Sequence, residues 1–119
     1  MFKTLFLALV AAALIALPAS AKSNAITLKG ETGPGFKIEV EKAGRDLRTT
    51  RAGTYRIKVE DKSSIHNFHL IGPGLNKKTS VGFTGERTWT IKLKPGRYTY
   101  RSDKRKKLRG AFTVTPASS

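Results

Sequence analysis

Apolar and polar residues alternate along most of the chain after residue 24. Phe36, Ile38 and Val40 alternate with charged residues, and a period of two recurs at 55–59, 89–93, 98–101 and 112–114, with a further short segment at 26–28. This period places successive side chains on opposite faces of an extended backbone, which is typical of half-buried strands. The pattern therefore predicts a chain built from short β-strands.

Turn signals separate these strands. They are Gly33-Pro34-Gly35, Ala52-Gly53, Gly72-Pro73-Gly74 and Lys94-Pro95-Gly96. Residues 41–50 could hold a short helical turn, but nothing after residue 24 keeps a sustained helical period. About seven short strands predict an all-β fold, an antiparallel β-sandwich, in which Trp89 fills the core.

The first 21 residues have the pattern of a secretory signal peptide. Lys3 is followed by an apolar run from Leu5 to Leu17, and Ala19-Ser20-Ala21 supplies small residues for cleavage after Ala21. A membrane anchor is the alternative, but the run is shorter than the roughly 20 residues that a spanning helix needs. We therefore expect residues 1–21 to be removed and residues 22–119 to form one secreted or periplasmic domain without a transmembrane anchor.

The composition is strongly basic. The 119 residues include 23 Lys and Arg against 8 Asp and Glu, for a formal net charge of +15, and there is no cysteine. The missing cysteine excludes disulfides, thiol catalysis, zinc–thiolate sites and iron–sulfur clusters. From Arg87 to Ser119 there are ten basic residues and one acid, Asp103.

Two segments resemble the cupredoxins, the blue-copper sandwich family of plastocyanin and azurin. Residues 64–74 (SIHNFHLIGPG) resemble the strand and loop that present the first histidine ligand, and residues 93–114 resemble the last two strands with the ligand loop between them. The resemblance covers roughly residues 26–114. It implies a cupredoxin-like Greek-key β-sandwich.

The same resemblance identifies where copper ligands would lie. A blue-copper site uses two imidazoles, a thiolate and a weak axial thioether. Of these positions only His66 keeps its ligand, because Ser102, Arg105 and Leu108 stand where the family has Cys, His and Met. Serine hydroxyls stay protonated near neutral pH, and arginine brings a fixed charge. We therefore expect a degenerate member without a type 1 copper centre and without another cofactor.

His66 and His69 are the only histidines. We expect both on one extended strand, where their spacing of three places them on opposite faces and disfavours a shared metal ion. His66 could carry a residual copper or zinc site, and either histidine could bind metal together with a ligand from another chain. The alternative is that His66 caps the sandwich through hydrogen bonds to backbone, with Asn67 nearby.

The run from Lys104 to Arg109 holds five cations in six positions. In a cupredoxin it would lie at the pole that normally holds copper. Clustered cations attract polyanions through local potential and counterion release. A solvated loop that only maintains solubility is the alternative. The anion- or partner-binding residues we expect are Arg101, Lys104, Arg105, Lys106, Lys107 and Arg109.

The sequence favours a binding or structural module over an enzyme. No Gly-x-Ser-x-Gly motif occurs, and the carboxylates are scattered among cations. No aromatic motif for base stacking accompanies the basic run, which disfavours specific DNA recognition. We expect an acidic protein or a polyanionic polymer of the envelope as partner. The remaining alternatives are copper binding with electron transfer through an atypical site, and a subunit of a larger complex.

Overall fold

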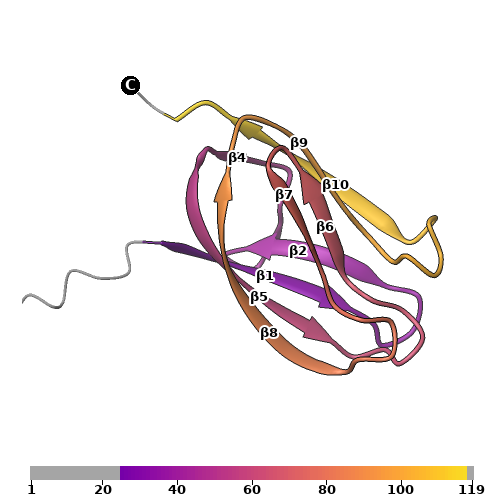
Figure 1. The fold of residues 1–119 in the computed structure, drawn as a ribbon. Coiled ribbons are helices and arrows are strands. Elements are labelled where there is room, and N and C mark those ends of the chain that lie inside the picture. Colours follow the sequence, from indigo (N-terminus) through magenta and orange to yellow (C-terminus); the bar gives the residue numbers. More distant parts are fainter. Residues whose placement is uncertain (1–24, 118–119) are drawn as a thin grey trace, which may run out of the picture.

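The alternating segments form strands in the computed structural model, which describes residues 25–117. These residues contain ten strands: β1 (Ile26–Thr32), β2 (Ile38–Lys42), β3 (Arg45–Asp46), β4 (Thr49–Arg51), β5 (Gly53–Asp61), β6 (His69–Gly72), β7 (Leu75–Lys78), β8 (Gly85–Leu93), β9 (Gly96–Arg101) and β10 (Arg109–Thr115). The first sheet has the order β3-β2-β1-β5-β8, and the second has the order β4-β10-β9-β6-β7. The two sheets pack against each other as a sandwich (Figure 1).

The core lies between the sheets and uses the inward-facing residues of the alternating pattern. Ile57 and Val59 of β5 are buried on one side, and Tyr98 and Phe112 of the second sheet are buried on the other. The Tyr98 and Phe112 rings stack with their centroids 5.4 Å apart. Full burial of a side chain of this size stabilises the fold by about 1.5–3 kcal/mol. Packing of the two inner faces therefore holds this cysteine-free domain together.

The predicted all-β sandwich is confirmed, with differences in the strands. The structure has ten strands where about seven were expected, and both sheets are mixed. β1 runs parallel to β5, and β10 runs parallel to β4, where an antiparallel arrangement was expected. Alternation within one strand specifies which face is buried but not the direction of its neighbour, so the sequence could not distinguish these pairings.

Three local expectations need correction. Phe36 was placed on the inward face with Ile38 and Val40, but it precedes β2 and 61% of it is exposed. The expected helical turn within residues 41–50 is instead a hairpin between β2 and β3. Ala43 and Gly44 turn this hairpin with positive φ angles of 53° and 77°. Trp89 is only partly buried and packs at the margin of the core.

Residues 1–21, with the predicted signal peptide, lie outside the described part of the chain. Within residues 25–117, no helix has the length and apolar character needed to cross a membrane.

A close approach between Gly72 and Tyr98 anchors one end of the second sheet. The Tyr98 hydroxyl accepts a hydrogen bond from the Lys94 amide at 2.9 Å and donates one to the Pro73 carbonyl at 2.9 Å. A Cβ at Gly72 would lie 2.1 Å from the Tyr98 ring. The fixed ring cannot move away without loss of these bonds.

We predict that Gly72→Ala lowers the free energy of unfolding by about 1–3 kcal/mol because it overpacks the core against Tyr98. Gly82→Ala is the matched control, since a Cβ there meets no atom within 4 Å. Urea denaturation of both variants measures the difference. Equal stability of the two variants would contradict the predicted clash.

Candidate functional site

Two loops meet at one end of the sandwich, which we call the pole. They are residues 62–68, which lead into β6, and residues 102–108, which connect β9 to β10. His66 and Ser102 join the two loops, since His66 Nδ1 lies 3.0 Å from Ser102 Oγ. Both residues are buried. The pole is therefore closed by a contact between two buried polar side chains.

The Ser102 hydroxyl organises this contact. Its Oγ accepts hydrogen bonds from the backbone amides of Lys104 at 3.2 Å and Arg105 at 3.3 Å. With both lone pairs used, the hydroxyl proton is available to His66 Nδ1. This arrangement makes Nδ1 an acceptor and places the proton of a neutral imidazole on Nε2. One serine thus fixes both the turn of its own loop and the orientation of His66.

Leu108 closes the other end of the 102–108 loop. Its side chain is buried, its amide donates to the Arg105 carbonyl at 2.9 Å, and its carbonyl accepts the Ser102 amide at 3.0 Å. The Arg105 guanidinium turns outward and lies 5.9 Å from the centre of the Phe36 ring. Phe36 in turn meets His66 edge-on, with the ring centres 6.1 Å apart.

These residues do not fit a type 1 copper ion. The imidazole nitrogen of His66 that faces the loop is already hydrogen-bonded to Ser102, a hydroxyl rather than a thiolate. Arg105 carries a charge that repels a cation, and Leu108 has no donor atom. Within residues 25–117, no three side chains of His, Asp or Glu form a group that could hold a metal. The donor set at the pole therefore cannot supply blue-copper coordination.

The structure changes the expected environment of His66. His66 precedes β6 and does not share an extended strand with His69, so the argument from opposite strand faces does not apply. Its ring contacts the Ser102 side chain and not the backbone that was expected. The Asn67 side chain does not support His66 but turns to Asp103 and Thr79.

A second polar network surrounds Asp103, the residue after Ser102. His69 Nδ1 lies 2.7 Å from Asp103 Oδ1, and His69 Nε2 lies 2.6 Å from Asn76 Oδ1. The Asn67 amide group donates to Asp103 Oδ2 at 2.9 Å, and its Oδ1 accepts the Asp103 backbone amide at 2.7 Å. Arg101 Nε completes the set at 3.4 Å. Asp103 therefore ties the 102–108 loop to β6 and β7.

The contacts of Asp103 determine its charge state. Partial burial raises its pKa, but hydrogen bonds from His69 and Asn67, the charge interaction with His69 and a hydrogen bond from Arg101 outweigh burial and lower the pKa from 3.8 to about 2. The sequence indicated Asp103 only as a single acidic residue among cations. Its position next to a candidate ligand was the available signal, but two of its partners, His69 and Asn67, lie 34 and 36 residues away in the chain.

Buried Asp61 fixes the neighbouring loop. Its carboxylate accepts the Ser63 amide at 3.0 Å and the Thr79 hydroxyl at 3.1 Å. Thr79 also accepts the Phe68 amide at 2.9 Å, so it connects β5 to the residues before β6. Burial raises the pKa of Asp61. These bonds hold the 62–68 loop, and with it His66, in place.

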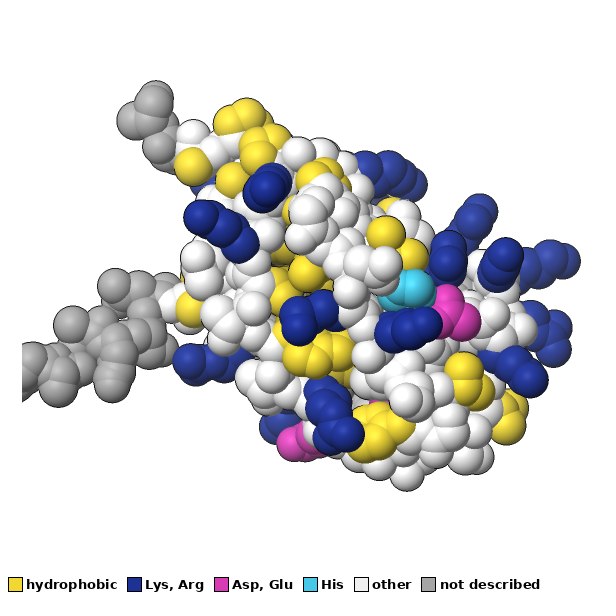
Figure 2. Space-filling view, viewed as in Figure 1, with side chains coloured by type: hydrophobic (Ala, Val, Ile, Leu, Met, Phe, Trp, Pro, Cys, Tyr) yellow, Lys and Arg dark blue, Asp and Glu magenta, His cyan; other side chains and the backbone are white. Residues whose placement is uncertain are grey.

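The cations of the basic run point to solvent. Lys104, Arg105, Lys106 and Lys107 are all exposed, as is Arg109 at the start of β10. Figure 2 shows Lys and Arg side chains gathered at the end of the molecule where the β9–β10 loop lies. The structure thus places the predicted anion-binding residues together at the pole, with Arg101 beside Asp103.

The strand register brings carboxylates together in pairs that the sequence did not indicate, and Glu31 with Glu39 is one of them. Glu31 of β1 faces Glu39 of β2 in the strand register, and Lys37 lies 3.7 Å from the first and 3.5 Å from the second. Lys62 contacts Glu31 at 2.8 Å and lowers its pKa, whereas burial raises the pKa of Glu39. The two lysines neutralise the pair, which gives it the character of a structural ion cluster.

We predict that Asp103→Asn lowers the free energy of unfolding by about 2 kcal/mol at neutral pH, because the variant loses a carboxylate whose pKa is depressed by its partners. A depressed pKa stabilises the fold fully above the unfolded value of 3.8, and this contribution disappears as the pH falls through about 2. Urea denaturation of the wild type and variant across that range measures the gap. A stability difference that stays constant down to pH 2 would contradict the assignment.

Comparison with known proteins identifies the fold. No family model and no curated protein matches the sequence. Among solved structures, the copper protein rusticyanin aligns with a TM-score of 0.57 and 16% identity over 79% of this chain and 80% of that chain. A structure of rusticyanin from Thiobacillus ferrooxidans aligns with a TM-score of 0.54 and 16% identity over 79% of both chains. The chain therefore has the cupredoxin fold that its sequence resembles, with a hydrogen-bonded pole in place of the cysteine-containing ligand loop.

Proposed function

We propose that this chain is an exported binding module that has kept the cupredoxin scaffold but uses its pole to contact acidic partners or polyanions. The observation that carries the proposal is the division of the 102–108 loop into two sets of residues. Ser102, Asp103 and Leu108 turn toward the protein and are held by hydrogen bonds or burial. The four residues between them, 104–107, are all basic and exposed. The inward residues give the cations a fixed platform.

A fixed platform favours binding. A mobile basic loop loses conformational entropy when it binds, whereas a preorganised loop avoids much of that cost. The three hydrogen bonds to Ser102 Oγ and the network around Asp103 supply such preorganisation. The charge then raises the local concentration of anionic partners and speeds their association.

Exposed apolar side chains lie beside the cations. Phe36 is 61% exposed and Ile65 is 62% exposed, and both flank His66. Arg105 lies against the Phe36 ring. An apolar surface next to arginine is typical of the central part of protein interfaces. This combination favours binding over catalysis, and it supports an acidic macromolecule over a small metal ion as the ligand.

We predict that neutralising Lys104, Lys106 and Lys107 to Gln sharply reduces retention on a heparin column, since each lost contact lowers the salt slope of binding by about 1. Arg105 stays unchanged because it packs on Phe36. The matched control replaces Arg45, Arg56 and Lys92 with Gln. These residues are exposed on the first sheet, so the control loses the same charge from another surface.

The two triple variants separate a localised site from an effect of net charge. We expect the control to elute near the wild type and the loop variant to elute at much lower salt. Equal elution of both variants would contradict a binding site at the pole.

A further inference from the structure

The two sheets differ in charge. The strands of the first sheet hold seven acidic and seven basic residues, whereas the strands of the second hold six basic residues and no acidic one. The six are Arg51, Lys77, Lys78, Arg97, Arg101 and Arg109. Asp103, in the loop beside the second sheet, is the eighth acid of the chain. The positive charge of the molecule is therefore concentrated on one layer of the sandwich as well as on one loop.

The arginines of the second sheet face solvent. Tyr98 and Tyr100 point into the core, so Arg97, Thr99 and Arg101 between and beside them point outward. On β10, Phe112 and Val114 point inward, and Arg109, Ala111 and Thr113 point outward. Thr50 is buried on β4, which turns Arg51 outward. We call this solvent-facing surface of β4, β9 and β10 the arginine face.

The strand register brings like charges together on the arginine face. Arg109 lies directly opposite Arg101, a pairing that is destabilising for two cations. Asp103 lies 3.4 Å from Arg101 and offsets part of this repulsion. Among residues 25–117, no carboxylate lies within 4.0 Å of the charged groups of Arg97 or Arg109. An anion on this face would relieve the part of the repulsion that Asp103 does not offset.

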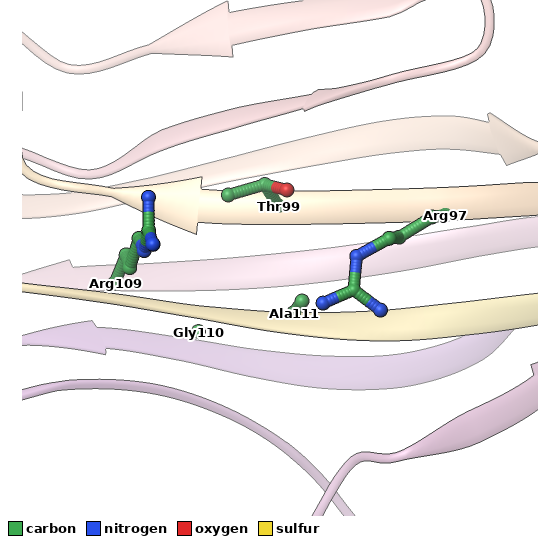
Figure 3. A pocket seen from close by; sticks show the side chains of 5 residues that line it. All are labelled: Arg97, Thr99, Arg109, Gly110 and Ala111. Atoms are coloured by element: carbon green, nitrogen blue, oxygen red, sulfur yellow. The ribbon is translucent and has the colours of Figure 1, made fainter.

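A shallow hollow lies between two of these arginines. Arg97, Thr99, Arg109, Gly110 and Ala111 line a space of about 360 Å³. Figure 3 shows the two guanidinium groups at either end, with Thr99 and Ala111 between them. The small central residues leave the backbone of β9 and β10 open to a ligand. Guanidinium groups bind tetrahedral oxyanions with paired hydrogen bonds, and a threonine hydroxyl adds a further donor.

The chemistry of the arginine face favours one class of polymer. The aromatic residues of the second-sheet strands, Tyr98, Tyr100 and Phe112, all point into the core. Nucleic-acid bases would therefore find no ring on which to stack. Arg109 and Arg101 lie opposite each other on strands about 5 Å apart, and Arg97 lies four residues, about 13 Å, further along β9. This line of cations suits an extended ligand that offers negative charge along its length. A chain of linked phosphates has this character and needs no apolar contact.

We propose that the arginine face binds a linear polyphosphate chain, with Arg97 and Arg109 as paired phosphate contacts and Thr99 as a hydrogen-bond donor between them. The proposal rests on the proposed function, because it assigns the anionic partner of the basic pole a chemical class and a path. From the 102–108 loop, such a chain continues past Arg109 and Arg101 onto the sheet. The loop then provides attraction at a distance, and the arginine face provides the specific contacts.

The test is calorimetric titration of inorganic polyphosphate into the wild-type chain, R97Q/R109Q, and the control R45Q/R56Q. The two double variants lose equal charge from exposed strand positions on opposite sheets. We expect R97Q/R109Q to weaken binding about a hundredfold, since a charge-assisted contact contributes roughly a tenfold effect. The control should weaken it only slightly. Amide chemical-shift changes at Thr99 and Ala111 on titration give a second readout that needs no variant.

Each outcome bears on the face and the pole separately. Equal weakening of the two double variants, or shift changes confined to residues 104–107, overturns the arginine face while the proposed function stands. If R97Q/R109Q loses polyphosphate affinity and the loop variant K104Q/K106Q/K107Q does not, the result supports the arginine face and contradicts a role for the loop. Failure of wild-type protein to bind polyphosphate at low salt overturns the arginine face, whatever the heparin column shows for the pole.

Discussion

The hydroxyl of Ser102 is the group on which the pole depends. It accepts hydrogen bonds from two backbone amides of its own loop and contacts His66 in the loop that leads into the neighbouring strand β6. In a blue-copper protein, a metal ion would join these loops through a thiolate at the matching position. Here hydrogen bonds join the two loops instead, each contributing about 0.5–1.5 kcal/mol net. The fold therefore needs no ion to bring its two polar loops together.

This substitution permits the positive charge at the pole. A cation held at the 102–108 loop would be repelled by Arg105 and its lysine neighbours, whereas a hydroxyl–imidazole contact is indifferent to them. Asp103 contributes the only carboxylate of the loop, and its contacts with His69, Asn67 and Arg101 occupy it. The remaining cations of the loop are exposed to solvent. The charge difference between the sheets extends the same surface onto β9 and β10.

The sequence predicted what depends on local pattern and missed what depends on pairing. Alternation correctly placed Ile57, Tyr98 and Phe112 in the core, because period two specifies the buried face. It could not give the parallel pairing of β1 with β5. It also misplaced Phe36, which follows the Gly33-Pro34-Gly35 turn and precedes the start of β2. The Ser102–His66 contact could be anticipated only through the family resemblance. The His69–Asp103 contact and the arginine face required the strand register.

Titration of the purified domain with Cu²⁺, followed by its unfolding temperature, tests the central claim most directly. An ion bound only by the native state raises the free energy of unfolding, and the increase grows with the logarithm of the ion concentration relative to the dissociation constant. We predict that stoichiometric copper leaves the unfolding temperature unchanged, because His66 is held by Ser102 and the other ligand positions lack donors. A rise in unfolding temperature that a chelator reverses and His66→Ala abolishes would contradict the account.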